Sequence, residues 1–142
     1  EHRSQALDLH EGLLAVWFSR FAATQANRET GQIAGNAAHR LTEAYTALVE
    51  RDYNQPVGVQ HFASRLGVTP THLSRACREA SGRPALEILK ERRHFEACRL
   101  LQDTDIPISQ IAKQTGFASA AYFTRAFRSN AGKSPSEFRS TA

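Results

Sequence analysis

Two pairs of arginine residues have a spacing that indicates a specific chemistry. Arg75 and Arg78 form the first pair, and Arg125 and Arg128 form the second. Residues three positions apart share one face of an α-helix, and guanidinium groups bind both phosphates and the major-groove edge of guanine. The two pairs therefore favour two helices that each present positive charge to a nucleic acid.

No pattern of side chains typical of an enzyme or a metal centre stands out. The two cysteines, Cys77 and Cys98, lie among apolar neighbours and form no Cys/His cluster with the spacing of zinc ligands. A DNA-repair methyl acceptor would need a zinc-bound nucleophilic cysteine, which this pair does not supply. We therefore expect reduced cysteines, no metal, no cofactor and no catalytic residues.

The positive charge of the chain is concentrated in its C-terminal part. The 142 residues include 18 lysines and arginines against 14 acidic residues, a formal net charge of +4. Residues 1–58 have five basic and seven acidic side chains, a net charge of −2, whereas residues 59–142 have 13 and seven, a net charge of +6. Such asymmetry favours a nucleic-acid partner for the basic part.

Helix signals recur along the whole chain, and strand signals are almost absent. In the basic part, Thr69 is expected to cap one helix, with Pro70 at its first position, and Ser119 is expected to cap another. Ser134 and Glu137 have the spacing of a capping box. The helices expected here cover residues 59–66, 70–81, 84–102, 108–115, 120–130 and a short stretch after Ser134.

Two segments of the basic part, Val59–Pro84 and Ile108–Pro135, repeat one pattern. An alanine and a glycine four residues later match at a separation of 49 residues, as Ala63 with Ala112 and Gly67 with Gly116. One residue inserted in the second repeat makes the next matches 50 residues apart. A second inserted residue pairs the prolines that close the two repeats, 51 residues apart. These matches are Arg75 with Arg125, Ala76 with Ala126, Arg78 with Arg128, Gly82 with Gly132, and Pro84 with Pro135.

Each repeat has the form of a helix-turn-helix unit. The alanine permits a close helix crossing, the glycine adopts positive φ in the turn, and Leu73 or Phe123 packs back on the first helix. The helix over residues 84–102 joins the units and would be about 28 Å long. Two recognition helices at that separation would enter successive major grooves, roughly 34 Å apart, and a short fit would bend the DNA.

Residues 56–139 resemble the DNA-binding domain of the AraC/XylS family of bacterial transcription regulators. The most specific stretch is IAKQTGFASAAYFTRAFRSNAGKSPSEFR, with its GF, YF-x-R-x-F and G-x-SP-x-E-F-R elements. The resemblance implies two helix-turn-helix subdomains joined by a long helix. It also implies a cytoplasmic, nucleoid-associated regulator, mostly an activator that recruits RNA polymerase, with a small-molecule effector bound by a separate N-terminal domain.

We therefore predict an all-α fold with two parts. Residues 1–55 form a helical segment that links the sensor to the DNA-binding domain or dimerises. Residues 56–142 form the double helix-turn-helix domain. Within it, residues 59–82 are the first unit, residues 84–102 the linker helix and residues 106–139 the second unit.

The residues expected to contact DNA lie on the second helix of each unit or beside it. The resemblance places Thr71 and Ser74 where the family commonly recognises bases. Arg75 is expected to bind a guanine edge or a phosphate, Arg78 a phosphate, and His72 either a phosphate or only solvent. The first unit contributes Thr69, Thr71, His72, Ser74, Arg75 and Arg78; the second contributes Ser119, Ala120, Ala121, Tyr122, Thr124, Arg125, Arg128 and Lys133.

The second unit departs from the family pattern at Ala120 and Ala121, where polar residues are common. Alanine makes no hydrogen bond to a base and can only contact a thymine methyl or permit close approach. The second unit is therefore expected to specify sequence less strongly and to act more through phosphates, while Tyr122 either reaches DNA or joins the core. Three other aromatic residues are assigned to the core: Phe117, Phe123 and Phe127.

The long helix carries basic residues of its own, Lys90, Arg92 and Arg93, among glutamates. We expect these side chains to form i,i+4 pairs on a solvated face rather than phosphate contacts.

The N-terminal residues 4–24 are expected to form a helix that is apolar on more than one face. Such a surface must pack on the rest of the chain, on a missing domain, or on a second copy, which would give a homodimer through residues 1–24. Residues 25–36 are expected to be a linker, followed by a helix over residues 37–53. The heptad-like apolar positions of the first helix are Leu7, Leu14, Phe18 and Phe21.

The chain contains no methionine, so we expect it to be part of a longer protein whose sensing domain lies elsewhere. No apolar run approaches the roughly 20 residues that span a membrane, and no membrane partner is expected. The alternative to a DNA-binding regulator is a protein-interaction fragment whose binding to DNA is weak without the missing sensor domain.

Overall fold

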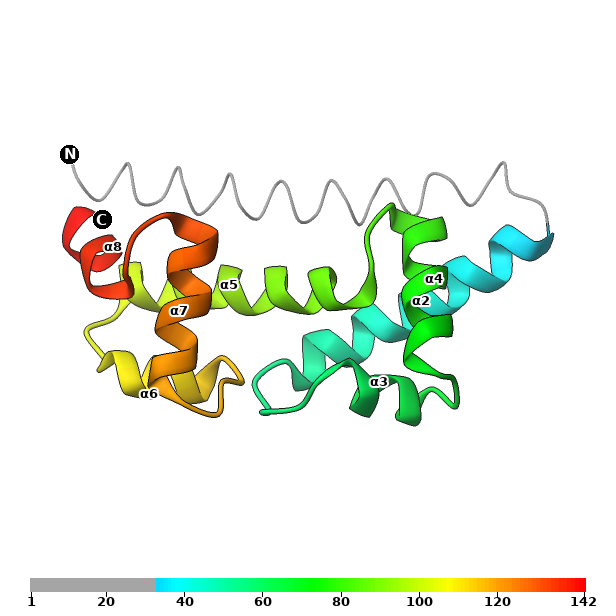
Figure 1. Cartoon of the computed structure of the whole chain (residues 1–142), viewed down its shortest axis with the longest axis horizontal. Helices are drawn as coiled ribbons and strands as arrows, with labels where there is room; N and C mark the ends of the chain where they lie inside the picture. The colour runs from blue at the N-terminus through cyan, green and yellow to red at the C-terminus, as the bar shows by residue number, and fades with distance from the viewer. Residues whose placement is uncertain (1–32) are drawn as a thin grey trace.

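The computed structural model describes residues 33–142, which fold into seven α-helices without a strand (Figure 1). This confirms the all-α prediction. The expected helix over residues 4–24, and with it the dimerisation prediction, lies outside the described residues. The helices are α2 (Ile33–Asp52), α3 (Val59–Arg65), α4 (Pro70–Ser81), α5 (Ala85–Asp103), α6 (Ile108–Gln114), α7 (Ala120–Ala131) and α8 (Pro135–Thr141).

Local sequence signals determine where the recognition helices α4 and α7 begin. The Thr69 hydroxyl accepts a hydrogen bond from the His72 amide at 3.1 Å, and Ser119 accepts one from Tyr122 at 3.1 Å. Each N-cap satisfies an amide that has no partner within its helix. The turns before these caps contain Gly67 at φ +71° and Gly116 at φ +82°, as the repeat predicts.

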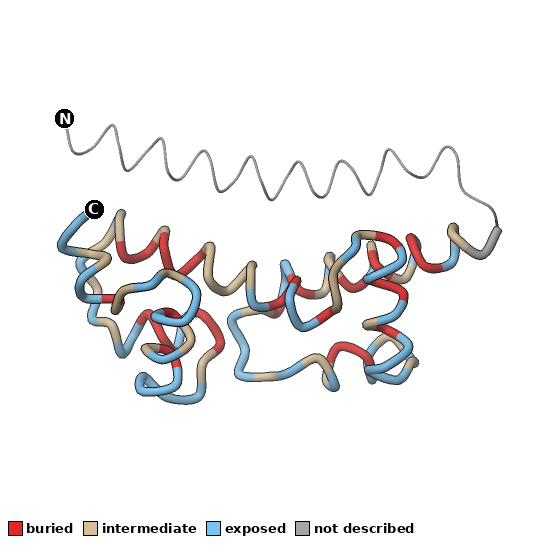
Figure 2. The backbone as a smooth tube through the Cα atoms, turned by 45° about the horizontal axis from the view of Figure 1, so that its top comes forward, coloured by how far each residue is buried: buried red, intermediate tan, exposed pale blue. Residues whose placement is uncertain are grey.

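Two hydrophobic cores lie at opposite ends of α5, and this helix contributes to both (Figure 2). The first half of α5 packs with α2, α3 and α4, and the second half packs with α6, α7 and α8. The first core includes Tyr45, Val49, Phe62, Leu73, Ile88 and Leu89, and the second includes Ala97, Leu101, Ile111, Phe123 and Phe127.

Helix α2, which falls before the boundary at residue 56 expected from the sequence, packs as part of the first core. Tyr45 is fully buried and donates a hydrogen bond from its hydroxyl to the Ala85 carbonyl at 2.6 Å. Its ring meets Phe62 of α3 edge to face, with the ring centroids 5.8 Å apart. Burial raises the pKa of the Tyr45 phenol above its usual value, so the group remains a donor.

The structure corrects the repeat alignment at its end. Pro84 is the N-cap of α5 with φ −68° and ψ 159°, and Ser134 is the N-cap of α8 with φ −68° and ψ 160°. Pro84 therefore corresponds to Ser134, 50 residues later, and the second insertion that pairs Pro84 with Pro135 is wrong. Proline fits both places because neither the N-cap nor the first helical position needs its N–H for an intrahelical bond.

Arg92 and Arg93 of α5 make tertiary contacts, and Arg92 also forms one of the expected i,i+4 pairs, with Glu96 at 3.7 Å. Arg93 donates to three backbone carbonyls of the segment between α2 and α3, those of Tyr53 at 3.0 Å, Gln55 at 2.9 Å and Val57 at 2.7 Å. Arg92 binds Glu50 of α2 at 2.7 Å and lies over the Tyr53 ring. The non-helical carbonyls of this segment need donors, and the Arg93 guanidinium supplies them.

The second helix-turn-helix unit also touches the segment between α2 and α3, through Gly116. A Cβ atom added to Gly116 would clash with the Tyr53 carbonyl oxygen and lie 2.8 Å from both Arg93 Nε and the Gln55 carbonyl oxygen. The turn of the second unit therefore packs on the segment that leads into the first unit. The relative position of α4 and α7 is determined by this contact as well as by α5.

Candidate nucleic-acid interface

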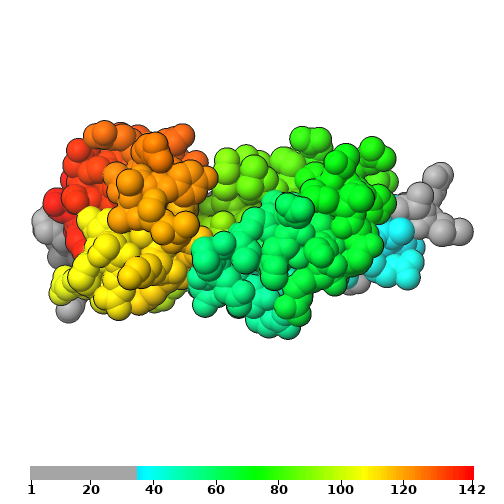
Figure 3. Space-filling view, turned by 60° about the horizontal axis from the view of Figure 1, so that its bottom comes forward, coloured from blue at the N-terminus to red at the C-terminus, as the bar shows by residue number. Residues whose placement is uncertain are grey.

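Helix α7 crosses α5 toward the C-terminal end of α5, α4 stands beside its N-terminal end, and the two recognition helices run in the same direction (Figure 1). Their N-terminal ends therefore face the same side of the molecule. The space-filling view of that side shows the two units as adjacent lobes (Figure 3). This arrangement presents two equivalent helix faces to one extended partner.

The predicted face of α4 is open to solvent. Thr71, His72, Arg75 and Arg78 are exposed and Ser74 is half-buried, while Leu73 on the opposite face is fully buried. The structure thus brings the predicted residues of the first unit together on one helix face. Arg75 and Arg78 form no hydrogen bond or ion pair with the described part of the chain, so both guanidinium groups remain open to an anion.

The predicted face of α7 has the same layout with smaller side chains. Ala120, Ala121, Tyr122 and Arg125 are exposed and Thr124 is half-buried. Tyr122, whose position the sequence left open, is 53% exposed. The three phenylalanines assigned to the core, Phe117, Phe123 and Phe127, pack together through edge or tilted ring contacts. Phe123 and Phe127 are buried.

Four predicted residues are partly engaged within the protein. The Thr69 and Ser119 oxygens cap their helices, which leaves each hydroxyl proton to be donated to a phosphate. Arg128 lies 3.7 Å from Glu137, and Lys133 donates to Thr141 of α8 at 3.2 Å. These are exposed and weak contacts, so a phosphate can replace them at little cost.

The structure adds two cationic residues that were not singled out from the sequence, Arg65 and Lys113. Both are exposed in the last turn of the helix before a recognition helix, α3 and α6 respectively. The signal in the sequence is a basic residue two or three positions before the turn glycine of each repeat. In helix-turn-helix proteins the first helix crosses the nucleic-acid backbone, so these positions suit phosphate contacts.

The two cysteines offer no reactive group beside this interface. Both are free and buried. Burial raises the pKa of Cys77 to about 11 and that of Cys98 to about 12, so both thiols stay protonated near neutral pH. Residues 33–142 contain no group of three or more His, Cys, Asp or Glu side chains arranged to hold a metal ion.

Comparison with known proteins identifies the family. A family model described as a helix-turn-helix domain matches residues 62–141. The probable transcription factor PqrA of Proteus vulgaris is 34% identical over 86 residues, which cover 61% of this chain and 70% of PqrA. The chain belongs to the AraC-type family of transcriptional regulators.

Two further comparisons show what share of a known regulator the chain matches. The HTH-type transcriptional regulator GlxA of Rhizobium meliloti is 35% identical over 111 residues, but the match covers 74% of this chain and only 34% of GlxA. The DNA-binding domain of AdpA, solved in complex with a target DNA, superimposes with a TM-score of 0.63 at 27% identity, covering 70% of this chain and 89% of that domain.

The chain contains an AraC-type DNA-binding domain, and the family and its homologues are DNA-binding transcription regulators rather than enzymes. It spans about a third of the length of GlxA and about two thirds of that of PqrA. None of the helices α2 to α8 combines the length and apolar character needed to cross a lipid bilayer.

Proposed function

We propose that the chain recognises double-stranded DNA in a sequence-specific manner by inserting α4 and α7 into successive major grooves. The observation that carries the proposal is the parallel placement of two capped, solvent-open helix faces on one rigid support. Helix α5 has 19 residues and is therefore about 28 Å long, somewhat less than the roughly 34 Å between major grooves on one face of DNA. A rigid protein with this shorter spacing favours DNA that bends toward it.

The two units divide the work of recognition unequally in this proposal. Thr71, Ser74 and Arg75 supply hydrogen-bonding groups to base edges, with Arg75 able to bind the two acceptors of a guanine. On α7, Ala120 and Ala121 present only methyl groups, which suit a thymine methyl. Arg78, Arg125, Arg128 and Lys133, together with the N-cap hydroxyls and Arg65 and Lys113, bind phosphates. His72 and Tyr122 extend the contact surface.

The wider regulatory role extends the same proposal and rests on likeness to the family. In it, the complete protein is a cytoplasmic, nucleoid-associated bacterial activator that contacts RNA polymerase. A domain outside these 142 residues binds a small-molecule effector, and residues 1–24 form a homodimer. The competing proposal is an interaction fragment with weak DNA affinity of its own, which the many apolar residues in the sequence of the N-terminal segment favour.

Selection of bound duplexes from a random DNA pool, followed by fluorescence anisotropy at several salt concentrations, tests the DNA proposal. We expect a site with two half-sites one helical turn apart, and an affinity that falls steeply with salt as counterions are released. Arg75→Ala should weaken binding by about 10-fold or more and relax base preference in one half-site. The control is Arg40→Ala, at an exposed position of α2. Equal binding by both variants, or no enriched site, would refute the proposal.

A further inference from the structure

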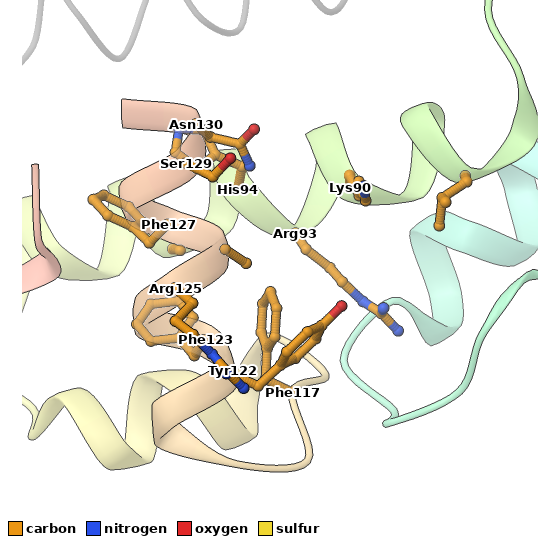
Figure 4. Close-up of a pocket in the computed structure, with 13 residues that line it drawn as sticks. Lys90, Arg93, His94, Phe117, Tyr122, Phe123, Arg125, Phe127, Ser129 and Asn130 are labelled. Atoms are coloured by element: carbon orange, nitrogen blue, oxygen red, sulfur yellow. The ribbon is translucent and has the colours of Figure 1, made fainter. Parts of the chain in front are cut away.

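A groove between α5 and α7 has the form of a small-molecule site. It encloses about 310 Å³, which lies at the lower end of the range usual for ligand pockets. Figure 4 shows its two walls: α5 with Lys90, Arg93 and His94, and α7 with the residues from Tyr122 to Asn130. The groove opens beside the recognition helix, between the two units.

The floor of the groove is aromatic. The rings of Phe117 and Phe123 have centroids 5.2 Å apart, and those of Phe117 and Tyr122 are 5.6 Å apart. Tyr122 is 53% exposed and Leu86 is 46% exposed, and these are the large apolar side chains that the described residues leave in contact with water. Both line the groove. An apolar body bound there would cover the exposed aromatic and aliphatic surface together.

The charged groups of the groove are cationic. Lys90, Arg93 and Arg125 line it, and no aspartate or glutamate does. Arg93 is held by backbone carbonyls, whereas Lys90 and Arg125 form no hydrogen bond or ion pair within residues 33–142. Burial lowers the pKa of His94, so this side chain stays neutral and adds no charge. The charge of the groove is therefore positive and unbalanced.

We propose that this groove binds a small flat monoanion, an aromatic ring that bears a carboxylate. The ring lies against Phe117 and Tyr122, and the carboxylate accepts a hydrogen bond from the Lys90 ammonium group. The positive charge and the exposed rings together favour an aromatic carboxylate. A phosphate of DNA would pair with the cations but leave the rings in water. A neutral apolar molecule would cover the rings but leave the cations without a counter-charge.

Occupancy of the groove affects DNA binding, a consequence that rests on the proposed function. Tyr122 and Arg125 line the groove and also belong to the predicted DNA-facing surface of α7. A ring bound against Tyr122 covers part of that surface, so ligand and DNA compete at the second unit.

Calorimetric titration of the full chain with 2-naphthoate, without DNA, tests the site. We expect saturable binding to one site, and binding at least fivefold weaker for the neutral analogue 2-naphthamide. Lys90→Gln should weaken 2-naphthoate binding at least fivefold, whereas the charge-matched control Arg40→Gln, at an exposed position of α2 that does not line the groove, should not. Ala126→Phe, which fills the groove, should abolish binding, with circular dichroism to confirm its fold. The site is refuted if binding does not saturate, or if Lys90→Gln binds like the control.

A second titration addresses the competition. Saturating 2-naphthoate should raise the dissociation constant for DNA at least threefold in the unaltered chain and have little effect in Lys90→Gln. An unchanged DNA affinity in the presence of bound 2-naphthoate would overturn the competition. If the proposed function is wrong, the chain will not bind DNA even without 2-naphthoate. The calorimetric titration contains no DNA, so its result would not change.

Discussion

Replacing Gly116 by alanine should damage the protein more than the same replacement at the equivalent Gly67. Both glycines have positive φ, +82° and +71° respectively, so each alanine costs about 1 kcal/mol in backbone strain. A Cβ at Gly67 meets no atom within 4 Å, whereas a Cβ at Gly116 meets two backbone carbonyls and Arg93. Gly67→Ala is therefore a matched control for strain.

The extra cost at Gly116 follows from the contact of the second unit with the segment between α2 and α3. Ordinary van der Waals separation begins near 3.4 Å, so the atoms at 2.8 Å must move apart by at least about 0.6 Å. That displacement acts on Arg93, whose three hydrogen bonds to carbonyls involve a charged donor and contribute about 1.5–3 kcal/mol each. Loss of the equivalent of one such bond gives about 3 kcal/mol for Gly116→Ala against about 1 kcal/mol for Gly67→Ala.

Urea unfolding of the two variants measures this difference. DNA binding supplies an independent readout, because the Gly116 contact positions α7 relative to α4. On duplexes whose half-site spacing varies by one base pair, Gly116→Ala should lose at least threefold of the unaltered chain's preference for its best spacing, and Gly67→Ala should keep that preference. Equal losses of stability together with an unchanged spacing preference would refute the reasoning.

Two other predictions concern stability. Tyr45→Phe removes the hydroxyl that satisfies the buried Ala85 carbonyl and should cost about 1–2 kcal/mol in urea unfolding, and a loss below a few tenths of a kcal/mol would contradict this. Burial lowers the pKa of His94 below its ordinary value of 6.5. The contribution of neutral His94 to the stability of the folded state is therefore complete above pH 6.5. It is lost as the pH falls, because the unfolded chain binds the proton more readily than the folded chain does. The fall in stability from pH 7 to pH 5 should be smaller in His94→Leu than in the exposed control His72→Gln, and equal slopes would contradict the assignment.

The features that could be predicted from the sequence are those set by near neighbours in the chain. The hydroxyl of Thr69 caps a helix that begins one residue later, and the positive φ of Gly67 is a property of a four-residue turn. Such interactions depend only on local spacing, so the helices and the exposed face of α4 follow from the pattern. Leu73 and Phe123 are buried as expected for the same reason.

The features that could not be predicted join residues distant in sequence. Arg93 contacts carbonyls 36 to 40 residues away, and nothing in the pattern of α5 distinguishes it from a solvated arginine. Tyr45 joins a core formed largely by later residues, because the space between α3, α4 and α5 needs a large apolar group from outside the repeat. The groove beside Tyr122 likewise exists only because α7 and α5 diverge there in three dimensions.

The shared helix α5 makes the two units interdependent in folding. Its first half has Leu89 in one core and its second half has Leu101 in the other, and a helix forms cooperatively along its length. Unfolding of either unit removes support from the helix that the other unit needs, so the molecule exchanges its amides and unfolds as one cooperative block. In the proposed complex with DNA, binding at one half-site would therefore lower the entropic cost of ordering the unit that binds the other half-site.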